Sequence, residues 1–252
     1  MILAILQARV SSSRLPGKVI RPILGEPMLV RQIERILRAR LIDKLIVATS
    51  SQSEDDVIEH LCKKIGIECF RGSLNDVLDR FYQATRPYNP QHVVRLTGDC
   101  PLTDPDVIDR LISFHLGGDY DYSSNALEPT YPDGLDAEVM KLSSLEQAWR
   151  EADNTACREH VTLFLYQHPQ LFKIGVEKNL VNLSHLRWTV DELKDFELVE
   201  KIYQYFYSHN PKFTIQDILI YLEECPELKT INTSFKRNEG LGKSLCNKSE
   251  NQ

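Results

Sequence analysis

The sequence lacks three features that would each mark a whole class of protein. It has no basic excess, because 30 Lys and Arg against 36 Asp and Glu give a net charge of −6. Duplex DNA binders usually carry such an excess, so we expect no nucleic-acid partner. No apolar run is long enough to cross a bilayer, which excludes a membrane-spanning segment. The six cysteines form no CxxC pair, which excludes a zinc ribbon and a thioredoxin-like redox site.

The overall composition is that of an ordinary folded chain. The 252 residues are 42% hydrophobic and 26% charged, which excludes wholesale disorder, a collagen-like repeat and a coiled coil. The opening apolar run is short and has no basic segment before it, unlike a secretory signal. We therefore expect a cytoplasmic protein whose thiols stay reduced.

The first half of the sequence alternates short apolar runs with segments of helical periodicity. The runs predict strands at residues 2–8, 44–49, 67–70 and 92–97. The periodic segments predict helices at 28–40, 53–65, 74–86 and 104–115, with Ser53 as an N-cap. This alternation is typical of βαβ units. It predicts an α/β fold with a mainly parallel, twisted sheet and helices on both faces.

From Asp119 the sequence becomes rich in turn residues, which predicts strands and a long loop. Further helices are expected at 143–151, 155–166, 191–208 and 215–222, and strands at 172–176 and 186–190. After about residue 235 the chain has little apolar content. We expect one domain over residues 1–235 and a disordered tail at 236–252.

A polar loop, 9-RVSSSRLPGK-18, follows the first predicted strand. Its three cations, three hydroxyls and one glycine are suited to cradle an anion together with backbone N–H groups. It is not a Walker A loop, because Ser12 stands where the first glycine is required and Val19 follows the lysine. The dinucleotide motif GxGxxG is also absent. The alternative is a solvated polar loop without a ligand.

Two aspartates follow later predicted strands and are candidate metal ligands. Asp99, in 95-RLTGDCPL-102, lies just past a strand. The carboxyl ends of parallel strands meet at one edge of a sheet, so Asp99 is expected near the cationic loop. Asp191, in 187-RWTVDELKDF-196, lies between a predicted strand and a helix. Hard divalent cations prefer such oxygen ligands. The alternatives are that Asp99 stabilises its own turn and that Asp191 only caps the helix.

Other polar groups carry weaker signals. The segment 131-YPDGLDAE-138 packs three acids around a glycine and is typical of a hairpin turn. The run 158-REH-160 fits a solvated helix face. The other histidines show no metal spacing, and the GxSxG elbow of the α/β-hydrolases is absent.

Together these motifs resemble the cytidylyltransferase family, which includes the enzymes that activate Kdo and sialic acid as CMP-sugars. The closest similarity is to the branch named for the spore-coat polysaccharide protein SpsF. It runs from Met1 to about Leu222 and rests on 7-QARVSSSRLPGKVI-20, 25-GEPML-29, 71-RGSLNDVLDRF-81, 95-RLTGDCPLTDPDVID-109, 125-NALEPTYPDGLDAEV-139 and 187-RWTVDELKDFELV-199. Leu193 and Lys194 replace a more usual Pro-Glu pair, outside the expected ligand contacts.

The resemblance implies a Rossmann-like three-layer αβα nucleotidyltransferase fold and the use of CTP and Mg²⁺. The triphosphate would be held by Arg9, Ser12, Arg14 and Lys18. Gln7 and Ala8 would contact the cytosine, with Arg71 and Asp76 near the base or ribose. Asp99 and Asp191 would bind the magnesium ion. The expected substrate contacts include Arg95, Asp133, Asp136, Arg158 and His160, the last four toward the acceptor.

The resemblance also implies a homodimer, in which a smaller β-containing segment at about 120–165 builds the acceptor site and reaches the partner. An acceptor oxygen would attack the α-phosphorus of CTP, and pyrophosphate would leave. Arg14, Lys18 and Asp99 are the expected catalytic residues, and no convincing general base is found. The leading acceptor is an acidic sugar, of ulosonic or nonulosonic type, for a surface glycan. The alternatives are a phosphorylated or non-sugar acceptor, or an inactive nucleotide-binding partner protein.

Overall fold

The structure of the protein is a computed structural model that describes residues 1–235 and Arg237. Apart from Arg237, the predicted disordered tail at 236–252 lies outside the described residues. None of the described helices is long and apolar enough to cross a membrane.

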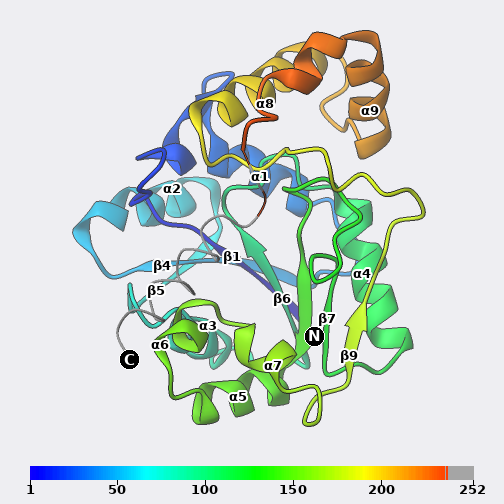
Figure 1. The fold of residues 1–252 in the computed structure, drawn as a ribbon. Coiled ribbons are helices and arrows are strands. Elements are labelled where there is room, and N and C mark those ends of the chain that lie inside the picture. Colours follow the sequence, from blue (N-terminus) through cyan, green and yellow to red (C-terminus); the bar gives the residue numbers. More distant parts are fainter. Residues whose placement is uncertain (236, 238–252) are drawn as a thin grey trace.

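Most of the strands join into one large sheet (Figure 1). The strands are β1 (Ile2–Gln7), β2 (Pro22–Ile23), β3 (Glu26–Pro27), β4 (Lys44–Ser50), β5 (Glu68–Gly72), β6 (His92–Thr97), β7 (Tyr122–Ser124), β8 (Glu138–Lys141) and β9 (Ile174–Val176). In the described part of the chain, the large sheet has the order β5-β4-β1-β6-β8-β7-β9, and β2 pairs with β3 in a small hairpin.

The large sheet is mainly parallel, as predicted. β5, β4, β1 and β6 are parallel neighbours, and β9 is parallel to β7. β8 is inserted antiparallel between β6 and β7. Strand order reverses at β1, because β4 lies on one side of it and β6 on the other. A ligand in a sheet of this type binds beyond the carboxyl ends of the strands at such a reversal.

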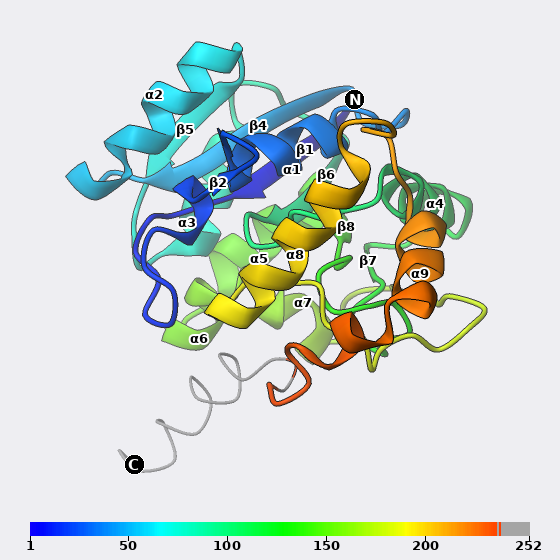
Figure 2. The same ribbon diagram turned by 90° about the horizontal axis from the view of Figure 1, so that it is seen from above.

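Helices cover both faces of the sheet and complete the three layers. They are α1 (Met28–Ile36), α2 (Asp56–Ile65), α3 (Val77–Thr85), α4 (Pro105–Gly117), α5 (Leu142–Glu151), α6 (Thr155–Glu159), α7 (Leu163–Gln167), α8 (Leu193–Phe206) and α9 (Ile215–Glu224). Short 3₁₀ turns occur at Lys18–Ile20, Ser53–Asp55 and Pro226–Thr230. Both views show α8 beside α1, and Figure 1 shows α5 and α7 across the sheet from them (Figures 1 and 2).

The two faces of β1 lie in two separate apolar clusters. Ala4 and Leu6 belong to the cluster that includes side chains of α1, α2, α4, α8 and α9. Leu3 and Ile5 belong to the cluster with α3, α5, α6 and α7. Alternate residues of a strand point to opposite faces, so a strand buried on both sides must be apolar throughout. This is why the run at 2–8 could be recognised from its sequence.

Three local predictions are wrong. The segment 186–190 is not a strand, because the N–H groups of Trp188 and Thr189 donate to Asp133 O, at 2.6 and 2.7 Å. The predicted helix at 155–166 is broken between α6 and α7, where Val161 has a φ of 32°. Ser53 is not the N-cap of a long helix but begins a 3₁₀ turn before α2.

Candidate active site

The loops that follow β1 and β6 meet at the carboxyl edge of the sheet. The two strands pair in parallel from Ile2 with His92 to Gln7 with Thr97. Just beyond them, Gly98 N donates to Gln7 O at 2.7 Å. A Cβ at Gly98 would lie 3.0 Å from both Ala8 Cβ and Gln7 O, so this close approach favours glycine. The prediction that the cationic loop and Asp99 share one edge is confirmed.

The cationic loop closes on itself before the 3₁₀ turn at Lys18–Ile20. Gly17 N donates to Val10 O at 3.1 Å, and Lys18 N donates to Leu15 O at 3.2 Å. Gly17 has a φ of 69°, in the left-handed region that glycine adopts without strain. Asp55 anchors the start of the loop by accepting from Val10 N at 2.7 Å. The result is that Lys18 points inward, with its side chain only 10% exposed.

The Lys18 ammonium lies between the two candidate metal ligands. Its Nζ is 3.2 Å from Asp99 Oδ2 and 2.8 Å from Asp191 Oδ1, and it donates to Val190 O at 2.8 Å. Arg14 pairs with the other oxygen of Asp191, at 2.7 Å. Residues from the loop after β1, the loop after β6 and the segment before α8 therefore converge on one point.

These charges change the pKa values of the groups involved. Burial alone would raise the pKa of Asp99, but Lys18 and hydrogen bonds from Thr97 and Cys100 outweigh it, and the pKa falls to about 2. Burial alone would lower the pKa of Lys18, but Asp99 and Asp191 raise it above its ordinary value. Asp99 and Lys18 are therefore both charged at neutral pH.

Asp191 is positioned by an ion-pair network rather than by a cap. The N-cap of α8 is Glu192, which forms a capping box with Asp195, so a capping role for Asp191 is wrong. Asp195 also accepts from Asp191 N at 3.0 Å. Arg187 donates to Asp195 at 2.9 and 3.0 Å and to Asp191 at 3.3 Å. The Asp191 carboxylate is thereby directed toward Lys18 and Arg14.

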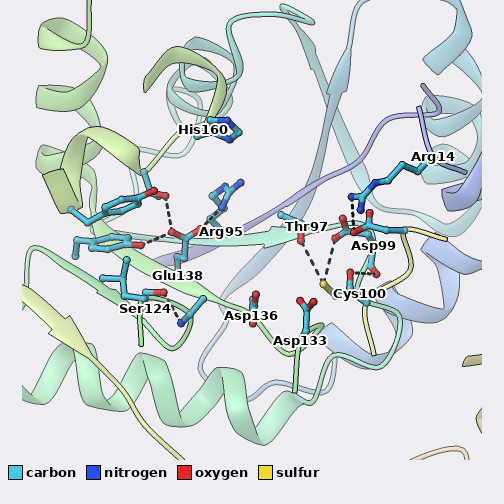
Figure 3. Close-up of a pocket in the computed structure, with 17 residues that line it drawn as sticks. Arg14, Arg95, Thr97, Asp99, Cys100, Ser124, Asp133, Asp136, Glu138 and His160 are labelled. Carbon is cyan, nitrogen blue, oxygen red and sulfur yellow. Dashed lines mark hydrogen bonds and ion pairs between the residues drawn. The ribbon is translucent and has the colours of Figure 1, made fainter. Parts of the chain in front are cut away.

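Two adjoining cavities, each of ≈ 480 Å³, open at this edge. We call the first the loop cavity; it is lined by Gln7, Ala8, Arg9, Ser11, Ser12, Ser13, Arg14, Lys18, Val19, Arg95, Thr97, Gly98, Asp99, Glu159, His160 and Asp191. We call the second the acidic cavity, shown in Figure 3; its lining adds Cys100, Tyr122, Ser124, Ala126, Leu127, Asp133, Asp136, Glu138, Thr162, Tyr166 and Thr189. Six residues line both: Arg14, Arg95, Thr97, Asp99, His160 and Asp191.

Most of the predicted site residues line one of these cavities. Gln7, Ala8, Arg9, Ser12 and Lys18 line the loop cavity, and Asp133 and Asp136 line the acidic one. The break between α6 and α7 brings His160 to both, and it brings Thr162 to Glu138, whose Oε1 accepts from Thr162 Oγ1 at 2.7 Å.

Three predicted substrate residues line neither cavity and are held in ion pairs. Arg158 pairs with Asp76 at 2.6 Å, which ties α6 to the start of α3. Asp76 is also the N-cap of α3, accepting from Asp79 N at 2.9 Å. Arg71 pairs with two acids of the α2 segment and donates to the carbonyl oxygens of Ser50 and Gln52. A role in substrate binding stays a prediction for all three.

Several residues of the site were not found from the sequence. Glu138 lines the acidic cavity and forms an ion pair with Arg95 while accepting from Tyr122 and Thr162. Arg187 is the first residue of the motif that pointed to Asp191. Its spacing of four and eight residues from Asp191 and Asp195 is the signal that could have marked it.

The donor set at this edge fits a magnesium ion. Among the described residues, no three acidic, His or Cys side chains are grouped so that they could hold a metal by themselves. Mg²⁺ is commonly bound by only one or two carboxylates together with substrate phosphates and water. Asp99 and Asp191 supply two carboxylates that already share one cation, the Lys18 ammonium.

Comparisons with known proteins agree with this geometry. The model of the family described as cytidylyltransferase matches residues 3–236. The chain is 34% identical to the spore coat polysaccharide biosynthesis protein SpsF of Bacillus subtilis over 91% of this chain and 97% of that protein. A solved cytidylyltransferase from Leptospira borgpetersenii is 30% identical, with a TM-score of 0.87 over 94% of this chain and 99% of the other.

A more distant solved structure shares the fold. It is a CMP:2-keto-3-deoxy-manno-octonic acid synthetase in complex with CTP. It is 16% identical, with a TM-score of 0.64 over 81% of this chain and 98% of the other. The predicted nucleotidyltransferase fold is thereby confirmed.

Proposed function

The chain belongs to the cytidylyltransferase family, and from this premise we propose that it transfers CMP from CTP to an acidic sugar, with Mg²⁺, for the synthesis of a surface polysaccharide. One observation carries the proposal: the Lys18 ammonium lies between Asp99 and Asp191, at the point where the loops after β1 and β6 meet. The likeness to SpsF supports a role in polysaccharide synthesis.

The loop cavity is the proposed CTP site. Backbone N–H groups, serine hydroxyls and the side chains of Arg9, Arg14 and Lys18 can neutralise and orient a triphosphate there. Gln7 supports a base contact, because its buried Oε1 has no hydrogen-bond partner among the residues that the structure describes. The exocyclic amine of cytosine would provide the missing donor, whereas uracil has no donor at that position.

The acidic cavity is the proposed acceptor site, since it adjoins the loop cavity across six shared residues. An acceptor oxygen lying at this boundary would form a bond to the α-phosphorus while the bond to the pyrophosphate oxygen breaks. The acceptor proton would pass to water. Transfers of this kind are catalysed mainly by positioning and by stabilising the developing charge.

Asp99 and Asp191 would hold Mg²⁺, which when bound supplies positive charge to the phosphate oxygens. Lys18 would then turn from the two aspartates, and Arg14 from Asp191, to the phosphates. Cys100 would help to keep Asp99 in place, because burial raises the pKa of its thiol and the neutral thiol donates to Asp99 Oδ1 at 3.4 Å. Cytoplasmic residence, a homodimer and a single domain over 1–235 stay predictions.

A thermal-shift panel tests the nucleotide half of this proposal. CTP, UTP, GTP and ATP are each added with and without Mg²⁺ to the wild type, to Asp99→Ala and to the control Glu223→Ala, whose side chain is 77% exposed. At about 100 times its dissociation constant, CTP should stabilise the wild type by about 2.7 kcal/mol. The additional stabilisation that Mg²⁺ gives in the presence of CTP should be lost in Asp99→Ala and kept in the control. A preference for another nucleotide would overturn the cytidylyl assignment.

A further inference from the structure

We propose that Asn232, in the segment that follows the 3₁₀ turn at Pro226–Thr230, is a positioning residue for the metal ligand Asp191. This inference rests on the proposed function, because that proposal assigns the Mg²⁺ site. Asn232 itself lines neither cavity. It acts through Asp195 and Arg187, so the working part of the site extends into the last described segment of the chain.

The amide group of Asn232 joins two parts of the network that surrounds Asp191. Asn232 is buried, with only 3% of its surface exposed. Its Nδ2 donates to Asp195 Oδ1 at 2.8 Å and to Arg187 O at 2.9 Å. An amide nitrogen of this kind carries two hydrogens, and each is directed to a separate acceptor. One side chain therefore ties the Asp195 carboxylate to the backbone of Arg187.

Asp195 transmits this constraint to the backbone of Asp191. Asp195 has no exposed surface. Its Oδ2 accepts from Asp191 N at 3.0 Å and from Glu192 N at 2.9 Å. A rotation of the Asp195 carboxylate would disturb both bonds, and the bond from Asn232 to the other oxygen opposes that rotation. Asn232 thereby helps to fix where the chain enters α8.

Arg187 transmits the constraint to the side chain of Asp191. Its guanidinium donates to both oxygens of Asp195, at 2.9 and 3.0 Å, and to Asp191 Oδ2 at 3.3 Å. Asp191 Oδ1 is then directed toward the shared cation site, which Lys18 Nζ occupies at 2.8 Å. Residues that orient a metal ligand in this way commonly change metal affinity about 10–100-fold when they are replaced.

The contacts of Asn232 separate the metal from the triphosphate. Within residues 1–235 and Arg237, its amide nitrogen donates to Asp195 and Arg187 and to no group of the cationic loop at 9–18. The loop is held instead by its own backbone bonds and by Asp55. Loss of the Asn232 amide should therefore weaken the effect of Mg²⁺ and leave the binding of CTP alone nearly unchanged.

Calorimetric titration of CTP at a series of free Mg²⁺ concentrations tests this inference. The wild type is compared with Asn232→Leu, which keeps nearly the same volume and removes both donors. In the variant, the Mg²⁺ concentration that half-maximally strengthens CTP binding should rise about 10–100-fold, and CTP affinity without Mg²⁺ should change by less than about twofold. A purely structural role would lower the melting temperature without changing the Mg²⁺ dependence of the folded protein.

The matched control is Thr233→Val, on the next residue of the same segment. Thr233 is exposed, and its hydroxyl donates to Thr230 O at 3.3 Å, outside the network around Asp191. This variant should keep the wild-type Mg²⁺ dependence. Asn232→Ser is the second variant if Asn232→Leu does not fold. A serine has one hydrogen to donate, so it can hold at most one of the two acceptors and should shift the Mg²⁺ dependence in the same direction.

The inference is overturned by an unchanged or stronger Mg²⁺ dependence in a folded Asn232 variant, or by an equal loss of CTP affinity with and without Mg²⁺. The same change in Thr233→Val, or failure of both Asn232 variants to fold, would also overturn it. The wild-type titration separates the two proposals. If CTP does not bind, or if Mg²⁺ does not strengthen its binding, the proposed function fails. If the wild type shows this dependence and Asn232→Leu keeps it, only the present inference fails.

Discussion

At the residue scale, Asp136 shows how a site carboxylate affects the stability of the whole chain. Burial raises its pKa to about 7, against about 3.9 for an aspartate in an unfolded chain. A group whose pKa is raised on folding contributes stability that is fully present below the unfolded pKa. That contribution is lost as the pH rises through about 7.

Asp136→Asn removes this titration. From pH 5 to pH 8, the free energy of unfolding of the variant should therefore rise by about 1–3 kcal/mol relative to the wild type. Urea denaturation at four pH values across this window measures the difference. Asp121→Asn, which changes a carboxylate outside both cavities, is measured beside it as the control. A constant difference between Asp136→Asn and the wild type would mean that Asp136 is ionised throughout.

At the scale of elements, the turn at Gly134 joins the acidic cavity to the segment before α8. Gly134 has a φ of 112°, and a Cβ there would lie 2.4 Å from Thr189 N and 2.6 Å from Trp188 C. These are backbone atoms, which cannot move without breaking the hydrogen bonds from Trp188 and Thr189 to Asp133 O.

Gly134→Ala should therefore destabilise the protein by about 3 kcal/mol or more, because both the backbone conformation and the close contact oppose a side chain. The matched control is Gly117→Ala at the end of α4, where an added Cβ meets no atom within 4 Å. That change should be neutral or stabilise by up to about 1 kcal/mol. Urea denaturation measures the free energy of unfolding of both variants. If Gly134→Ala were as stable as Gly117→Ala, the contact between residues 134 and 189 could relax.

The segment before α8 also shows which elements could be predicted from the sequence and which could not. β1, β4 and β6 were predicted within about one residue, because strands buried on both faces must be continuous apolar runs. The run at 186–190 is apolar at three of its five positions, but the N–H groups of Trp188, Thr189 and Val190 bond to the Asp133 and Asp99 carbonyl oxygens instead of a neighbouring strand. No local pattern carries that information, because the partners are distant in the sequence.

The candidate site was predictable to a similar extent. The loop positions of Lys18 and Asp99 followed from strand order, whereas the place of Asp191 outside the cap of α8 did not. Two aspartates lie within five residues, and Asp195 rather than Asp191 completes the capping box. The pairing of Arg71 with the α2 segment, and of Asp76 with Arg158, likewise depends on tertiary contacts.

At the scale of the whole molecule, the site connects the amino-terminal half of the sheet to the carboxyl-terminal helices. Lys18, from the loop after β1, bonds to Asp99 after β6 and to Val190 O and Asp191 before α8. Tyr203 of α8 in turn donates to Pro101 O at 2.8 Å. A ligand that draws Lys18 away from the two aspartates therefore changes the charge balance at a junction of three parts of the chain.

This junction predicts that CTP and Mg²⁺ bind cooperatively. When a triphosphate attracts the Lys18 ammonium, Asp99 and Asp191 lose a shared cation, and a divalent ion can replace it. Each ligand should then strengthen the binding of the other by the same factor, about 5–150-fold, because coupling between two sites is reciprocal. Calorimetric titration of CTP at several Mg²⁺ concentrations, and of Mg²⁺ with and without CTP, measures both sides of this relation.

Lys18→Met tests both proposed roles of the lysine, which are to neutralise Asp99 and Asp191 in the free protein and to contact the phosphates of CTP. Without the ammonium, Asp99 and Asp191 lack the cation that they share, so Mg²⁺ should bind the free protein more tightly than it binds the wild type. Its binding should also depend much less on CTP, while CTP itself binds more weakly for want of a phosphate contact. The pKa of Asp99 should rise from about 2, because the Lys18 charge that opposes the effect of burial is gone. If the variant instead binds Mg²⁺ no better than the wild type, Lys18 does not compete with the metal. The two aspartates would then be positioned for the lysine alone.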